Sequence, residues 1–277
     1  MIQRTAVAAL LITATLFSAA IAQEASVVDK EALIDQFLAA DRRQWEQIED
    51  VVLEAEYLEG KQEDDGFKQE ARYLKKVYIK LLDDTALFRE RYLEYYKDGE
   101  LQSVEERDKK AGEKLEDARK RKTRNVSYPM LEPFFPENRD QYEIEYVGID
   151  EVEDTTCYQL RVKSLVEDDE HIDGVYYFET DGFHLVRVDF SPAKLVKKTM
   201  FKLNRLDMSI TYAPTVDGYW LPEQFEIVGK GKAAFLFGVN FAAIEYYRNP
   251  QVNVGLPEEM FYETPEDEEN NEASDDG

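Results

Sequence analysis

The sequence predicts an α+β protein whose strands form an antiparallel sheet. An amphipathic helical pattern begins at Asp29, and period-two alternation of apolar and polar residues then fills two blocks, 51–96 and 142–247. The turn dipeptides Asp181-Gly182 and Asp217-Gly218 join neighbouring runs, which is typical of an antiparallel meander.

The first 22 residues predict a cleaved secretory signal peptide. Arg4 gives a positive start, an apolar stretch runs from Ala6 to Phe17, and Ala20-Ile21-Ala22 offers small residues for cleavage. A retained membrane anchor is the alternative, but the apolar run is short for crossing about 30 Å of hydrocarbon. No cysteine follows the cleavage point. We therefore expect an exported, soluble and unlipidated chain, located in the periplasm if the cell has two membranes.

The predicted domain spans residues 23–262 and starts with one helix. Asp29 can cap this helix, which we expect to extend toward Trp45 and Ile48. Its apolar face carries Leu33, Ile34, Phe37 and Leu38.

Strand patterns follow the helix in two groups. Residues 51–58, 73–82 and 87–96 predict a three-strand meander, and the dense alternation beyond Tyr142 predicts a continuous antiparallel meander to about residue 247. In the run 201–212 the apolar parity changes, which predicts a bulge near Asn204. We expect Asp181-Gly182 to form a type I′ turn.

Two segments are dominated by charge. Residues 103–124 carry opposite charges three and four positions apart, which favours a solvated helical insertion or a mobile connector. The simpler interpretation of 103–124 is a solubilising insertion, and the alternative is a docking helix for a partner. Residues 263–277 predict a disordered acidic tail, with calcium binding as the functional alternative.

Composition limits the classes of partner. The chain has 59 acidic and 34 basic residues and a formal net charge of -25, so it repels nucleic acid and anionic lipid surfaces. Cys157 is the only cysteine, so no disulfide can form within one chain.

The sequence offers no catalytic set. It contains no nucleophile elbow, no phosphate-binding loop and no dinucleotide fingerprint, and His171 and His184 are its only histidines. His171 stands in an acidic run, which indicates a solvated turn with a loose metal site as the alternative. His184 shares the parity of an apolar strand, which favours packing or exposure over metal ligation. We expect a protein that is not an enzyme and needs no cofactor or metal.

The second half resembles the LolA-like outer-membrane lipoprotein-sorting superfamily. The resemblance lies in 142–163 (YEIEYVGIDEVEDTTCYQLRVK), 173–188 (DGVYYFETDGFHLVRV) and 216–227 (VDGYWLPEQFEI). It covers 140–248, and 30–100 more weakly. It implies an antiparallel β half-barrel capped by helices, with an apolar interior that shelters acyl chains in transit. The charged segment 103–124 and the acidic tail depart from the family pattern.

If the resemblance holds, the chain is a periplasmic carrier or binding protein for a lipid-like ligand or a lipoprotein. No nucleotide motif is present, so we expect a membrane protein as its loading partner. The alternative is an envelope scaffold or interaction protein with a filled core. Candidates for the cavity lining, for which ordinary core packing is the alternative, are Leu53, Tyr57, Ile79, Tyr92, Tyr146, Leu160, Tyr177, Met208, Ile210, Phe225 and Ile227.

Overall fold

The computed structural model describes residues 28–64, 66–82, 85–120, 130–195, 197–198, 201–233 and 237–262. The predicted signal peptide (1–22) and acidic tail (263–277) lie outside these residues, as does the end of the charged segment. The signal peptide and the disordered acidic tail therefore remain predictions.

The described chain consists of two longer helices, short 3₁₀ turns and many strands. The helices are α1 (Lys30–Trp45) and α2 (Val104–Lys120), and the 3₁₀ turns are η1 (Glu132–Phe134), η2 (Arg139–Gln141) and η3 (Glu258–Phe261). The strands are β1 (Asp50–Glu63), β2 (Gly66–Leu82), β3 (Thr85–Lys97), β4 (Glu100–Leu101), β5 (Tyr142–Val152), β6 (Thr155–Ser164), β7 (Ile172–Glu179), β8 (Leu185–Pro192), β9 (Lys197–Lys198), β10 (Phe201–Pro214), β11 (Trp220–Ala233) and β12 (Phe237–Val252).

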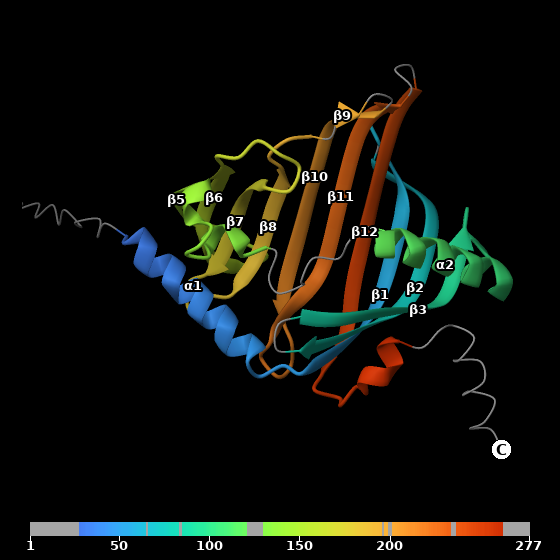
Figure 1. The fold of residues 1–277 in the computed structure, drawn as a ribbon, viewed down its shortest axis with the longest axis horizontal. Coiled ribbons are helices and arrows are strands. Elements are labelled where there is room, and N and C mark those ends of the chain that lie inside the picture. Colours follow the sequence, from blue (N-terminus) through green and yellow to red (C-terminus); the bar gives the residue numbers. More distant parts are fainter. Residues whose placement is uncertain are drawn as a thin grey trace, which may run out of the picture.

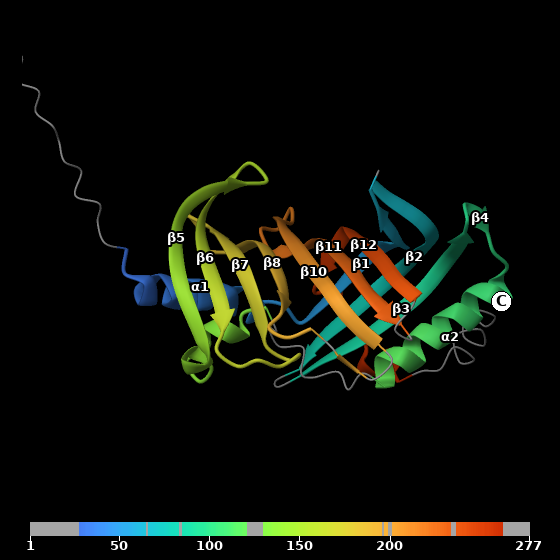
Figure 2. The same ribbon diagram turned by 90° about the horizontal axis from the view of Figure 1, so that it is seen from above.

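Within the described residues the strands form one open, twelve-stranded antiparallel sheet. Its order is β4-β3-β2-β1-β12-β11-β10-β8-β7-β6-β5, with β9 paired to β10. The sheet is strongly curved and its two ends do not meet (Figures 1 and 2). The predicted α+β class with an open antiparallel half-barrel is thereby confirmed.

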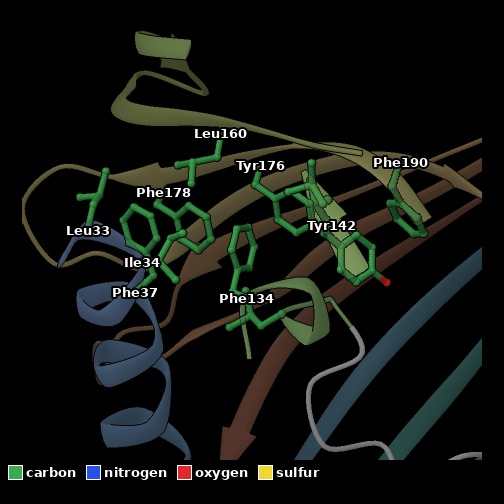
Figure 3. Packing of buried hydrophobic residues seen from close by; sticks show 12 residues of the cluster. Leu33, Ile34, Phe37, Phe134, Tyr142, Leu160, Tyr176, Phe178 and Phe190 are labelled. Carbon is green, nitrogen blue, oxygen red and sulfur yellow. The ribbon is translucent and has the colours of Figure 1, made fainter. Parts of the chain in front are cut away.

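The first helix forms where the sequence predicts it. The Asp29 carboxylate accepts hydrogen bonds from the backbone N–H groups of Glu31 and Ala32 at 3.1 and 3.2 Å, which caps the helix N-terminus. The buried face of α1 packs against β6, β7 and β8, with Phe37 stacked on Phe178 at a ring-centroid distance of 3.8 Å (Figure 3). This contact joins the helix to one half of the sheet.

The charged helix α2 lies at the other end of the molecule, beside β3 (Figure 1). Ser103 Oγ accepts the backbone N–H of Glu106 at its start, and the Arg107 guanidinium donates to the Leu93 carbonyl of β3 at 3.2 Å. The exposed pair Lys110–Glu113 at 2.6 Å is the predicted spacing of opposite charges.

Two local predictions have different outcomes. The pairing of β10 with β11 shifts register between Leu203 and Arg205, which confirms the bulge expected near Asn204. The prediction of a type I′ turn at Asp181-Gly182 is wrong. The Glu179 N–H donates to the His184 carbonyl across a wider connection, and the positive φ of 67° falls on Phe183 instead.

Candidate functional site

One face of the sheet, here called the inner face, carries an uninterrupted row of cross-strand neighbours. The register places them side by side in the order Tyr146, Leu160, Tyr176, Val188, Ile210, Phe225, Glu245, Tyr57, Tyr73 and Tyr95. The row is apolar or aromatic except at Glu245. The buried side of α1 packs mainly on β6, β7 and β8, and Trp45 at its end packs against residues of β1, β2 and β11.

A hollow of about 370 Å³, here called the α1 hollow, lies between α1, the segment 130–131 and the inner face. Its volume falls in the range of about 300–1,000 Å³ common for small-ligand sites. Most of its lining is apolar or aromatic: Phe37, Trp45, Val51, Leu53, Val77, Ile79, Phe88, Met130, Leu131, Phe178, Phe183, Leu185, Ile210, Tyr212, Trp220, Leu221, Pro222 and Tyr247.

The helical side of the hollow is fixed by an amide clamp. Gln44 Nε2 donates to the Trp220 carbonyl at 2.9 Å, and the Trp220 N–H donates to Gln44 Oε1 at 2.7 Å. Both residues line the hollow. The clamp therefore sets the separation of α1 from β11.

Asp41 brings a carboxyl group into this apolar setting. Burial raises the pKa of Asp41 from its ordinary value to about 7, and the hydrogen bond from Trp45 Nε1 to Oδ1 at 3.1 Å offsets part of that rise. The carboxyl is therefore partly protonated at neutral pH.

A buried ion cluster borders the hollow on the sheet side. The Lys75 ammonium, 5% exposed, lies 2.5 Å from Glu90 Oε1 and 2.7 Å from Glu245 Oε1. Burial works to lower the pKa of Lys75, but the two carboxylates outweigh it and the pKa is raised. Tyr92 donates to Glu90 Oε2 at 2.9 Å. The cluster holds two carboxylates and one ammonium.

His184, the residue before β8, lines the hollow. Its ring stacks on Trp220 with centroids 5.9 Å apart, and burial lowers its pKa. Burial therefore favours the uncharged imidazole. His171 is elsewhere, with its ring nitrogens 2.8 Å from Asp168 Oδ1 and from Gln141 Oε1.

The predicted lining residues fall into three groups. Leu53, Ile79 and Ile210 line the hollow. On the inner face, Tyr57 and Tyr92 flank Lys75, whereas Tyr146, Leu160, Met208 and Phe225 join the core under α1, and Ile227 lies opposite Met208. Tyr177 requires a correction. It lies between the buried residues Tyr176 and Phe178 on β7, so alternation turns it to the outer face, where it contacts Gln159.

Several lining residues were not singled out from the sequence. Trp220 stands in 216–227, one of the stretches that carry the sequence resemblance, and that resemblance could have marked it. Asp41 follows Phe37 by four positions, so helical spacing alone places it on the apolar face of α1. Lys75 lies on the same face of β2 as Val77 and Ile79, so strand alternation alone predicts that its charge faces inward.

A second hollow, of about 640 Å³, lies on the outer face and is more open. Both acidic and basic side chains line it, among them Arg161, Lys163, Asp189, Arg205 and Asp207. Such mixed charge is typical of a solvated surface.

Among the described residues no group of three His, Cys, Asp or Glu side chains is arranged to hold a metal ion. Cys157 is fully buried. No helix in the described ranges is long and apolar enough to cross a membrane.

The fold and the hollow define a class: an α+β protein with an open antiparallel sheet and an apolar recess beneath a helix. No family model and no curated protein matches the chain. Solved structures do match it. They include an outer membrane lipoprotein-sorting protein domain from Vibrio parahaemolyticus, with 11% identity, a TM-score of 0.42, and 82% of this chain and 97% of that chain covered.

Two further matches are similar in extent. A DUF1329 family protein from Desulfovibrio piger has 16% identity and a TM-score of 0.43, covering 83% of this chain and 96% of that one. A LolA superfamily protein from Nitrosomonas europaea has 10% identity and a TM-score of 0.35, with the same coverage. The chain is thus similar to structures of the superfamily that its sequence resembles.

Proposed function

We propose that this protein is a non-enzymatic, exported carrier or binding protein that holds the apolar chain of a lipid or lipoprotein in the α1 hollow. The observation that supports it most is the lining of that hollow, which is apolar or aromatic over most of its residues. Such a surface gains free energy by replacing water with hydrocarbon.

The size of the gain is adequate for a carrier. Each buried CH₂ group contributes about 0.8 kcal/mol, and ordering costs of several kcal/mol offset part of the sum. A chain of about ten buried carbons leaves a modest net affinity, which suits a ligand that has to be released. The proposal includes a membrane protein that loads the carrier, and a location in the periplasm if the cell has two membranes. The predicted signal peptide supports the location.

Titration with a neutral fluorescent alkyl probe tests this function. Val77 is 7% exposed and lines the hollow from β2, so Val77→Phe places a ring in the space the ligand needs. We expect at least about tenfold weaker binding, the equivalent of roughly 1.4 kcal/mol.

Val147→Phe is the matched control, because Val147 is 40% exposed on the edge strand β5 and does not line the hollow. It should bind the probe like the wild type. Saturable binding that Val77→Phe leaves intact, or no binding at all, contradicts the proposal and favours a scaffold with a filled core.

A further inference from the structure

We propose that the α1 hollow selects a lipid-like ligand whose head group is an ammonium or a neutral hydrogen-bond donor, and discriminates against a carboxylate head group. This inference rests on the proposed function, because it concerns the ligand of the same hollow. Its basis is the sign of the charged lining: Asp41, Glu90 and Glu245 are acidic, and no Lys or Arg lines the described hollow.

The acidic groups face the recess from two sides. Asp41 belongs to α1, whereas Glu90 and Glu245 belong to β3 and β12 of the sheet. A ligand between helix and sheet therefore meets carboxylates on both sides. Charges in apolar surroundings interact more strongly than charges in water, so an anionic head group is repelled there.

The adjacent cation is already committed. Lys75 is 5% exposed and contacts both glutamates, at 2.5 and 2.7 Å, so its charge is matched twice over before a ligand arrives. An anionic head group can recruit Lys75 only by displacing a carboxylate, which then lies unpaired in a buried place. Burial lowers the pKa of the neighbouring His184 and so favours its uncharged form.

The hydrogen-bonding capacity of the lining carboxylates favours the same head groups. At about pH 8, above its pKa of about 7, the Asp41 carboxyl is mostly ionised. Ionised carboxylates only accept hydrogen bonds, so the polar groups that complement them are donors. An ammonium or hydroxyl group donates, whereas a carboxylate head group offers acceptors to acceptors.

The test uses three probes with one fourteen-carbon chain: tetradecylamine, tetradecanol and tetradecanoate. Their dissociation constants are measured by displacement of the neutral alkyl probe at about pH 8, where the amine is cationic and the acid anionic. We expect the amine to bind at least about tenfold more tightly than the carboxylate, with the alcohol between them.

The overall charge of the protein, which is -25, could also favour the amine. Single variants distinguish that effect from the effect of the carboxylates in the hollow. Asp41→Asn and Glu90→Gln each remove one carboxylate from the hollow and leave the Lys75–Glu245 pair in place, and both should reduce the amine-to-carboxylate preference about threefold or more. Glu94→Gln is the control. It makes the same charge change on β3, but Glu94 bonds Tyr96 on the outer face and should leave the preference unchanged.

The outcomes distinguish the two proposals. Equal or tighter binding of the carboxylate, or a preference that survives both Asp41→Asn and Glu90→Gln, overturns the head-group inference while tetradecanol binding still supports the carrier. If tetradecanol and tetradecylamine both fail to displace the probe, the proposed function itself is wrong.

Discussion

Gln44 and Trp220 are joined by two hydrogen bonds, from the side-chain amide to the main-chain carbonyl at 2.9 Å and from the main-chain N–H to the amide oxygen at 2.7 Å. These residues are 176 positions apart. The pair attaches the last turns of α1 to the beginning of β11, above the hollow.

Gln44→Ala should therefore lower the free energy of unfolding by about 1–3 kcal/mol, because a mostly buried amide with both bonds satisfied is lost. Urea unfolding measures the change. Gln47→Ala is the control, since the exposed Gln47 side chain donates to the nearby Arg43 carbonyl, and the bond from Asn253 is to the Gln47 backbone carbonyl, which alanine keeps. Equal effects of the two variants would contradict a structural role for the clamp.

Phe37→Ala tests the attachment of α1 to β7. Phe37 is 1% exposed and stacks on Phe178 with an interplanar angle of 5°. Removing the ring leaves a cavity, and we expect a loss of about 3–5 kcal/mol of unfolding free energy. Leu38→Ala on the same helix, at a partly buried position, should cost less. A loss below about 1 kcal/mol for Phe37→Ala would mean that α1 is not held by this contact.

Asp50 anchors the chain after β12. Its carboxylate accepts hydrogen bonds from the N–H groups of Val254, Gly255 and Leu256 at 2.7, 3.0 and 2.8 Å. Asp50→Asn turns one acceptor into a donor that faces N–H groups, so we expect about 2–4 kcal/mol of destabilisation and faster proteolysis within 253–262. The exposed neighbour variant Glu49→Gln should change stability by less than about 0.5 kcal/mol. Unaltered proteolysis in Asp50→Asn argues against the anchor.

Asp41 makes stability depend on pH in a defined direction. Its folded pKa of about 7 lies above the unfolded value near 3.8, so the folded state binds more protons between these values. Stability from this group is complete below about pH 4 and is lost as pH rises toward 7. Relative to the wild type, Asp41→Asn should become more stable over this range by on the order of 2–4 kcal/mol. A difference that stays flat from pH 4 to pH 8 in urea titrations would disprove the shift.

Lys75→Met tests the ion cluster. The variant leaves Glu90 and Glu245 without the ammonium between them, and we expect about 3–5 kcal/mol of destabilisation. Lys76→Met, on the next position and the other face of β2, should cost far less. Similar unfolding free energies for both variants would show that the cluster contributes little.

Much of the fold was predictable because its signals are local. Asp29 and the apolar spacing of α1 place the helix start, and the parity change in β10 marks the bulge at Leu203 and Arg205. The pairing of β1 with β12, which joins the two strand groups, was not predicted. It brings Tyr57 beside Glu245 across the whole chain, and no local pattern encodes that register.

The site was less predictable than the fold. Alternation identifies which residues face inward, so Leu53, Ile79 and Ile210 were found, but a hollow is a place where packing stops. Leu160 and Ile79 have equivalent patterns, and only the position of α1 makes the first a core residue and the second a wall of the hollow. The pattern in β7 was assigned to the wrong face at Tyr177, because its neighbours Tyr176 and Phe178 are the buried residues.

Native mass spectrometry tests the carrier account most directly. The protein is expressed from a gene that includes the predicted signal peptide, residues 1–22, and is then purified. The account predicts a population heavier than the bare chain by the mass of a lipid, which is reduced in Val77→Phe and retained in Val147→Phe. A bare mass alone in all three proteins, together with no uptake of added tetradecanol, would contradict it.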